Sequence, residues 1–186
     1  MDIFDSFDHI YKIGAEARQA LQALIREKTY ARNEIVQDVG SRCKNIYIVR
    51  SGSARIFYYK DGHDVTEHFA FENEMMVRVE SLFTGLPTLK GIQTLDASTI
   101  ISIDAYHLFQ LYDKYHDIER LFRLLFEKEH VNTVKRLESL QFKSAAERYK
   151  ELLQTTDLVH KIPLKHIASY LGITQVSLSR IRAQMK

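Results

Sequence analysis

The last 23 residues constrain the fold of this chain more than any other segment. Two short crossing helices must bury apolar side chains at fixed spacings, and this segment supplies them at Leu164, Ile167, Leu171, Ile173, Leu178 and Ile181. Ala168 lies where the second helix would cross closest, and Gly172 lies in the tight turn, where a positive φ angle is expected. This spacing is typical of a helix-turn-helix, with a generic helical hairpin as the alternative.

The charge of the chain is distributed unevenly. Residues 158–186 carry Lys161, Lys165, Arg180, Arg182 and Lys186 without any Asp or Glu, a charge of +5. The rest of the chain holds 21 Lys and Arg against 24 Asp and Glu, a charge of −3. A basic end on a mildly acidic body is typical of a protein that binds a polyanion.

Candidate DNA-contacting residues follow from helix-turn-helix geometry, in which the second helix enters the major groove with its first turn towards the bases. Thr174 is expected to cap this helix and to bind a phosphate. Gln175 and Ser177 project from the first turn, and glutamine can pair with adenine. Arg180 lies one turn further on the same face and can contact guanine. The side chains expected to contact the DNA backbone are Lys161, Lys165 and Arg182.

Strand signals dominate the middle of the chain. Five of the seven glycines lie between Gly40 and Gly91. Short apolar runs separated by turns are found at 46–49, 54–59, 65–71, 92–95 and 99–103. Asp61-Gly62 predicts a hairpin, because a type I′ turn needs positive φ at both central residues. Many short strands predict a small β-barrel or roll.

Helical patterns flank these strands. They are found at 16–28, 105–112, 117–140, 145–154, 164–171 and 175–184. The helix at 117–140 would be about 36 Å long, and its apolar residues spread over more than one face. One face is expected to pack on the roll and the other on a second copy of the helix, with packing inside one chain as the alternative. The expected dimer contacts are Ile118, Leu121, Leu125 and residues further along.

Composition excludes several classes of protein. The chain has 186 residues, 45% of them hydrophobic, which is enough for a packed core. It has no membrane-length apolar stretch and no visible secretory signal, so a cytoplasmic location is expected. The single cysteine, Cys43, excludes an internal disulfide and a four-cysteine metal site. The histidines lack metal-ligand spacing, and no nucleophile–base pair stands out, so neither a metal site nor an enzyme is expected.

These segments together resemble the Crp/Fnr family of transcription regulators, over about residues 7–185. The most specific parts are Tyr47–Gly52 (YIVRSG) and Leu164–Arg182. The resemblance implies an α+β fold with a double-stranded β-helix, a jelly-roll-like β-roll of the cyclic-nucleotide-binding kind. The implied parts are the roll with flanking helices at 1–113, a long dimerisation helix at 114–143, and a small helix-turn-helix domain with a truncated wing at 144–186.

The resemblance also implies partners and base-reading positions. The partners are a second copy of the chain and a pseudo-palindromic site in double-stranded DNA, with RNA polymerase as a further candidate. The base-reading positions fall on Gln175, Val176 and Arg180. The family often has an acidic residue where Val176 stands, and valine can contact a thymine methyl group but cannot accept a hydrogen bond from cytosine. Only six residues follow Arg180, so any wing is expected from Leu158–Ile162.

The ligand motif of the family is altered in this chain. Relatives that bind cyclic AMP carry Phe-Gly-Glu and, further along, Arg-Ser. Residues 71–74 read FENE, so Glu74 matches the glutamate and Asn73 replaces the glycine. The second element falls in Leu86–Gly91, where Lys90 supplies a charge without the fork of an arginine. Glu74 and Lys90 are therefore the candidate effector residues. No cofactor is expected, cyclic AMP and cyclic GMP are expected not to bind, and any effector is expected to be uncharged or apolar.

Two functions from different classes remain open at this point. The first is a homodimeric DNA-binding transcription regulator without cyclic-nucleotide control. The second is a small-ligand-binding or protein-interaction module whose C-terminal hairpin does not read DNA. A salt-dependent, sequence-selective complex with DNA distinguishes them, because neutralising phosphates makes the affinity fall with salt.

Overall fold

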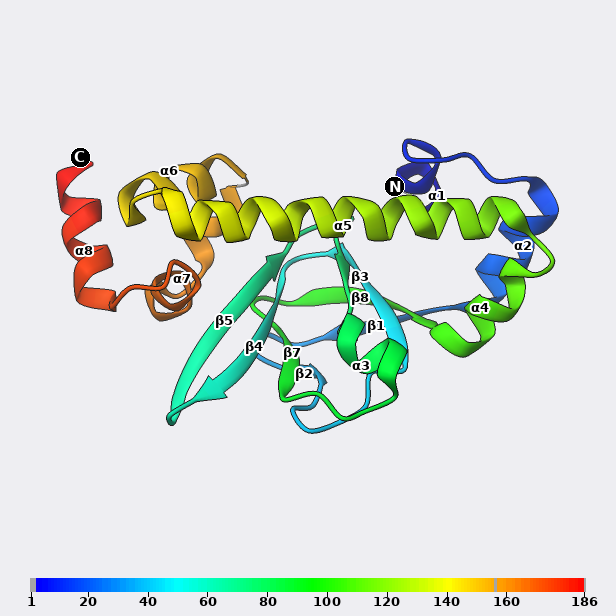
Figure 1. Ribbon diagram of the computed structural model, residues 1–186, viewed down its shortest axis with the longest axis horizontal. Coiled ribbons are helices and arrows are strands. Elements are labelled where there is room, and N and C mark those ends of the chain that lie inside the picture. The colour runs from blue at the N-terminus through cyan, green and yellow to red at the C-terminus, as the bar shows by residue number, and fades with distance from the viewer. Residues whose placement is uncertain (1–2, 156, 186) are drawn as a thin grey trace.

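A long helix, α5 (His116–Phe142), runs along the molecule above a β-roll (Figure 1). The computed structural model describes residues 3–155 and 157–185. At one end of α5 lie α1 (Ile3–Asp8), α2 (Ala15–Leu24) and α4 (Ala105–Tyr112). At the other end lie α6 (Ala145–Thr155), the 3-10 helix η1 (Asp157–Lys161), α7 (Leu164–Tyr170) and α8 (Gln175–Gln184). The predicted α+β fold with a long helix is confirmed.

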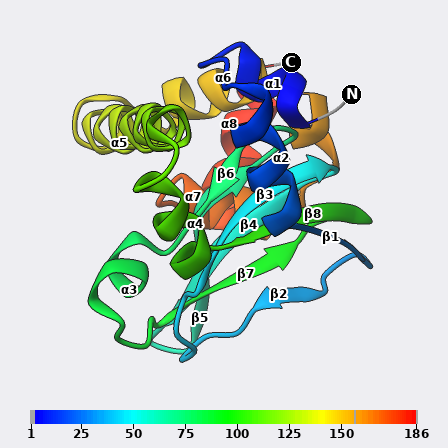
Figure 2. The same cartoon turned by 90° about the vertical axis from the view of Figure 1, so that its right-hand side faces the viewer.

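The roll consists of two antiparallel sheets (Figure 2). One contains, in spatial order, β1 (Ile25–Tyr30), β8 (Ser98–Asp104), β3 (Asn45–Ser51) and β6 (Met75–Met76). The other contains β2 (Ile35–Gln37), β7 (Lys90–Thr94), β4 (Ala54–Lys60) and β5 (His63–Ala70). Val49, Ile56, Ile92 and Ile100 are buried together in one cluster of the roll. A short helix, α3 (Val79–Thr84), connects β6 towards β7.

The predicted hairpin joins β4 to β5. Asp61 and Gly62 have φ angles of 50° and 76°, and Lys60 faces His63 across the turn. Positive φ at both central residues is the type I′ geometry that matches the twist of the flanking strands. β5 lies at the edge of its sheet, and α7 packs along it.

The helix predicted at 16–28 ends earlier than its periodicity indicates. α2 stops at Leu24, and Ile25–Tyr30 form β1 instead. Ile25 pairs with Ile103 and Tyr30 with Ser98, so these backbone groups find their hydrogen-bond partners in β8. A partner some 70 residues away cannot be read from local spacing, and such tertiary pairing overrides helix propensity.

The predicted dimer contacts on α5 need correction. Ile118 and Leu121 are fully buried and Leu125 is 7% exposed in the single chain, where they pack with α1, α2 and α4. Ile118 and Leu121 have no surface left for a partner and Leu125 has little, so of the predicted contacts only the residues further along α5 can still meet a second copy. The exposed apolar side chains of α5 lie further along, at Val131 (49%), Val134 (41%), Leu137 (55%) and Leu140 (41%).

Candidate nucleic-acid interface and ligand groove

The C-terminal helices have the packing predicted for a helix-turn-helix. Ile167, Leu171 and Leu178 are buried between α6, α7 and α8, and Ala168 is 2% exposed. The partly buried members of the same cluster include Ile173 and Ile181. Gly172 has φ 69°, the left-handed conformation expected for the turn. The two helices are therefore held in a crossed arrangement that exposes the outer face of α8.

The first turn of α8 is capped and faces solvent. Thr174 is the N-cap, and its Oγ1 accepts a hydrogen bond from the Ser177 backbone N–H at 3.2 Å. Gln175 and Arg180 are exposed, Val176 is 63% exposed and Ser177 is partly exposed. These predicted DNA-contacting side chains are therefore all accessible to solvent at the start and along the length of α8.

The basic side chains of this end are also exposed. Lys161, Lys165, Arg180 and Arg182 are all on the surface, and no carboxylate among the described residues forms an ion pair with them. Lys186 lies outside the described residues. Lys165 interacts electrostatically with Asp64 without forming an ion pair. A phosphate backbone attracts exposed positive charge of this kind.

The segment expected to supply a wing does not do so. Asp157–Lys161 form the 3-10 helix η1, and no strand occurs among the described residues after Asp104. The prediction of a wing from Leu158–Ile162 is therefore wrong. Ile162 is 5% exposed and packs in the helix-turn-helix core, so this segment lies against that core.

The helix-turn-helix is docked on the roll and on α5. The Thr66 backbone N–H donates to Ser169 Oγ at 3.0 Å, and the rings of Phe69 and Tyr170 lie 4.8 Å apart. Arg136 of α5 stacks on the Tyr170 ring at 3.6 Å and donates to the Tyr170 carbonyl at 2.7 Å. The same guanidinium donates to the Glu67 carbonyl of β5 at 3.1 Å. One arginine therefore joins the long helix, the roll and the helix-turn-helix.

A buried histidine lies at this junction. His166 of α7 is 4% exposed and faces Arg55 and Asp64, which form a two-pronged ion pair at 2.5 and 2.6 Å. Burial lowers the pKa of His166 from 6.5 to about 4, and the positive charge of Arg55 acts in the same direction. The histidine is therefore neutral at pH 7 in the folded chain.

The His166 environment predicts that stability falls on acidification. Between pH 6.5 and about 4 the unfolded chain binds a proton at His166 that the folded chain does not. The contribution of neutral His166 to the free energy of unfolding is therefore complete above pH 6.5 and is lost as the pH falls towards 4. For His166 the loss from pH 7 to pH 5 is about 2 kcal/mol. Burial lowers the pKa of His68 likewise to about 4, with the same sign. Urea unfolding at both pH values measures the loss. His166→Gln should reduce it, whereas the same change at exposed His63 should not; equal pH dependence in all three proteins would contradict the assignment.

A groove of about 1350 Å³ lies between α5 and the roll. Its apolar lining includes Phe71, Met75, Val77, Phe126 and Leu137. Its charged lining includes Glu67, Glu74, Arg78, Glu129 and Arg136. Burial raises the pKa of Glu129, and the neighbouring Glu74 carboxylate adds to this. The groove is thus largely apolar, with acidic and basic groups of both signs.

The two candidate effector residues do not meet. Glu74 lines the groove, but its Oε2 accepts from the Phe71 backbone N–H at 3.0 Å and so stabilises its own turn. Asn73, in place of the family's glycine, has φ 66°, a conformation that asparagine tolerates better than most residues. Lys90 is not among the lining residues and instead forms ion pairs with Glu67, at 2.9 Å, and with Glu80, at 3.9 Å.

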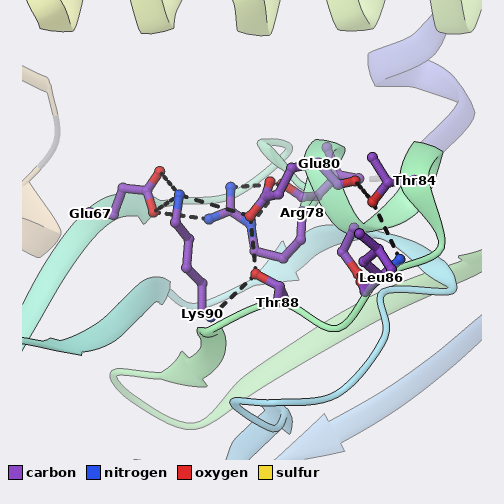
Figure 3. Close-up of polar contacts among 9 residues, drawn as sticks. Glu67, Arg78, Glu80, Thr84, Leu86, Thr88 and Lys90 are labelled. Atoms are coloured by element: carbon purple, nitrogen blue, oxygen red, sulfur yellow. Dashed lines mark hydrogen bonds and ion pairs between the residues drawn. The ribbon is translucent and has the colours of Figure 1, made fainter.

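The polar cluster around Lys90 contains Arg78 and also Glu67, which sequence reasoning missed (Figure 3). Arg78, which stands too early in the sequence for the family's arginine, is 8% exposed and donates to Glu67 Oε2 at 3.0 Å. Its Nε and second Nη donate to the Val77 carbonyl. Glu67 is the extra residue of a β-bulge, because His68 pairs with Ile56 and Thr66 with the next residue of β4. Bulges re-aim side chains, and strand alternation in the sequence carries no signal for this one.

Other candidate sites are not supported by the structure. Cys43 is 5% exposed and burial raises its pKa, so its thiol is neither accessible nor activated. Within 3–155 and 157–185, no group of His, Cys, Asp and Glu is arranged to hold a metal ion. No described helix is long and apolar enough to cross a membrane.

Comparisons with known proteins show which domain and which folds this chain resembles. Residues 27–115 match the cyclic nucleotide-binding domain. No curated protein matches the chain in sequence. FixK2 from Bradyrhizobium japonicum is 18% identical, with a TM-score of 0.73 over 87% of this chain and 84% of that one.

Two further solved structures have the same fold. The c-di-GMP responsive global regulator CLP from Xanthomonas campestris is 16% identical, with a TM-score of 0.70 over 92% of this chain and 91% of that one. A regulator assigned to the Crp/Fnr family from Eubacterium rectale is 16% identical, with a TM-score of 0.73 over 99% of this chain and 87% of that one. These two are named as regulators, and none of the three as an enzyme. Residues 27–115 therefore match the cyclic nucleotide-binding domain, and the chain as a whole has the fold seen in Crp/Fnr transcription regulators.

Proposed function

We propose that this chain is a DNA-binding transcription regulator of Crp/Fnr type that acts as a homodimer on a pseudo-palindromic site without cyclic-nucleotide control. The observation that carries the proposal is the outer face of α8. Its capped first turn presents Gln175 and Val176 to solvent, and Arg180 is exposed one turn further on, near basic side chains that form no ion pair with a described carboxylate. A recognition helix needs this combination of base-reading and phosphate-contacting groups.

The second part of the proposal is the two-fold assembly. Val131, Val134, Leu137 and Leu140 lie along the second half of α5, and each is at least 41% exposed. Val131, Leu137 and Leu140 also line the groove beside the roll, whereas Val134 does not. An exposed run of apolar side chains on a long helix is a surface that a second copy of that helix can cover. A two-fold axis there would present two α8 helices to successive major grooves of one DNA face.

The third part is independence from cyclic nucleotides. Their phosphate needs a free fork of donors, but the Arg78 guanidinium already donates to Glu67 and to the Val77 carbonyl. Glu74 and Glu129 add negative charge to the lining of the groove. The apolar remainder of the groove suits an uncharged or apolar effector better than an anionic one.

DNA selection tests the regulator proposal against a ligand or interaction module. The full-length chain is mixed with random-sequence duplexes, bound molecules are amplified over several rounds, and the selected site is titrated at increasing salt. We expect an inverted repeat and an affinity that falls linearly in log–log form with salt. Failure to enrich any sequence, with no salt-dependent binding, would favour the module.

Lys165→Ala is expected to lower the affinity for all DNA sequences to the same extent. Lys165 lies in α7, is exposed and is expected to contact phosphate rather than bases. Its removal should lower affinity by roughly two- to fivefold on selected and random duplexes alike, and should reduce the salt slope by about one per protomer. Lys60→Ala, an equal change of charge in the exposed β4–β5 hairpin, should have no effect. A loss confined to the selected site would mean that Lys165 reads bases.

A further inference from the structure

Two cations of the roll converge on one carboxylate of the same chain. Arg78 contacts Glu67 Oε2 at 3.0 Å, and Lys90 Nζ lies 2.9 Å from the same oxygen and 3.0 Å from the other (Figure 3). The side chain of Arg78 is 9% exposed, whereas those of Lys90 and Glu67 are about one-third exposed. Arg78 and Glu67 also line the groove beside α5. The carboxylate therefore occupies both cations at the wall of the groove that Arg78 and Glu67 line.

This pair of cations has the chemistry of an anion site. A guanidinium and an ammonium that meet at one point can hold a phosphate or carboxylate through charge-assisted hydrogen bonds. We propose that Glu67 is an internal plug, a carboxylate that fills the anion position between Arg78 and Lys90 and thereby excludes phosphate-bearing ligands from the groove. This inference rests on the proposed absence of cyclic-nucleotide control and names the residue that determines it.

Competition explains why an external anion loses to the plug. Glu67 is tethered to the site by its own strand, so its effective concentration there far exceeds that of a free ligand. A displaced Glu67 carboxylate would also stay close to the incoming phosphate and repel it. Glu80, whose Oε1 lies 3.9 Å from Lys90, brings the cluster of two cations and two carboxylates to neutrality. Neutralising Glu67 alone leaves one positive charge in excess.

The bulge at Glu67 separates the plug from the contact with the DNA-binding domain. Its side chain binds the cation pair, whereas its backbone carbonyl accepts from Arg136, which also binds the Tyr170 carbonyl. Glu67→Gln removes the charge and keeps the backbone and the size of the side chain. We therefore expect this variant to retain DNA binding without ligand, which separates the plug from the regulator proposal.

Calorimetry in phosphate-free buffer tests the plug. Cyclic AMP and inorganic phosphate are titrated separately into the wild-type chain, Glu67→Gln and Glu72→Gln, an equal charge change at an exposed turn residue. We expect Glu67→Gln to bind at least one of the two probes tenfold or more tightly than the wild type, a gain of about 1.4 kcal/mol. If only cyclic AMP binds more tightly, the groove contributes to the binding. If only phosphate binds more tightly, the anion position alone has opened. Glu72→Gln should behave as the wild type.

Further variants keep this test decisive. Glu67→Ala predicts the same gain and replaces Glu67→Gln if thermal unfolding shows that the glutamine variant is not folded. Adding Lys90→Ala to either variant should abolish the gain, because one of the two cations is then lost. Three results would overturn the plug. The first is no gain in affinity for either probe in Glu67→Gln or Glu67→Ala. The others are an equal gain in Glu72→Gln and tight binding of cyclic AMP by the wild type. DNA binding measured in parallel reports separately on the regulator proposal.

Discussion

Val134→Glu is expected to convert a dimer into monomers. Val134 is 41% exposed in the single chain, in the run of apolar side chains on α5. Across a two-fold axis the substitution brings two carboxylates into a contact that excludes water, where an unpaired charge costs about 3–5 kcal/mol. The dimer dissociation constant should rise by more than 100-fold, and DNA affinity should fall with it, because the two half-sites are no longer bound by one linked molecule.

Sedimentation equilibrium at micromolar concentration measures this effect. Val39→Glu is the matched control, since Val39 is 37% exposed but lies in the loop between β2 and β3, away from α5. The control should remain dimeric. A wild-type monomer, or a dimer that tolerates Val134→Glu, would exclude the second half of α5 as the interface. Leu125→Glu cannot serve here, because Leu125 is buried in its own chain and its replacement would damage the monomer core.

Arg180→Ala is expected to weaken binding at the selected site and to relax base preference at one position in each half-site. Arg180 is exposed on the outer face of α8, and a bidentate contact with guanine discriminates by about 1–3 kcal/mol. Because a dimer carries two copies, the total loss should be about 2–6 kcal/mol when the half-sites act independently.

A panel of duplexes with single base changes measures both effects by titration. Arg182→Ala is the control on the same helix, since it removes the same charge from a residue expected to contact the backbone. It should lower affinity on every duplex and leave base preference unchanged. If Arg180→Ala left affinity and preference as in the wild type, α8 would not be the helix that reads the bases.

Local spacing was sufficient to predict most helices and the β4–β5 hairpin. Gly172 and Asp61-Gly62 mark turns because positive φ favours few residue types, and the apolar positions of α7 and α8 mark what two crossing helices bury. The exposed side of α8, which we propose contacts DNA, follows from the same spacing, since a residue that is not needed for packing remains outside. These signals act over a few residues and are therefore visible in the sequence.

Long-range packing decided the remaining features. Ile25–Tyr30 form a strand only because β8 lies beside them, and Leu125 belongs to the core because α1, α2 and α4 cover the first half of α5. Helical periodicity shows that a side chain is apolar but not which surface covers it. Of the dimer contacts predicted along α5, those on the first half are buried in their own chain, so the proposed interface uses only the residues further along.

The ligand region also combines features that the sequence predicts with features that only long-range packing decides. The sequence by itself determined that Glu74 and Lys90 stand near the family's ligand motif, and that no arginine stands at the usual place. Only the tertiary structure decided that Lys90 binds Glu67, because a β-bulge turns that carboxylate towards Arg78. A bulge depends on how two strands pair, and pairing depends on the sheet that surrounds them. Composition and motif thus determine which charges are present, and the packed sheets determine which charges meet.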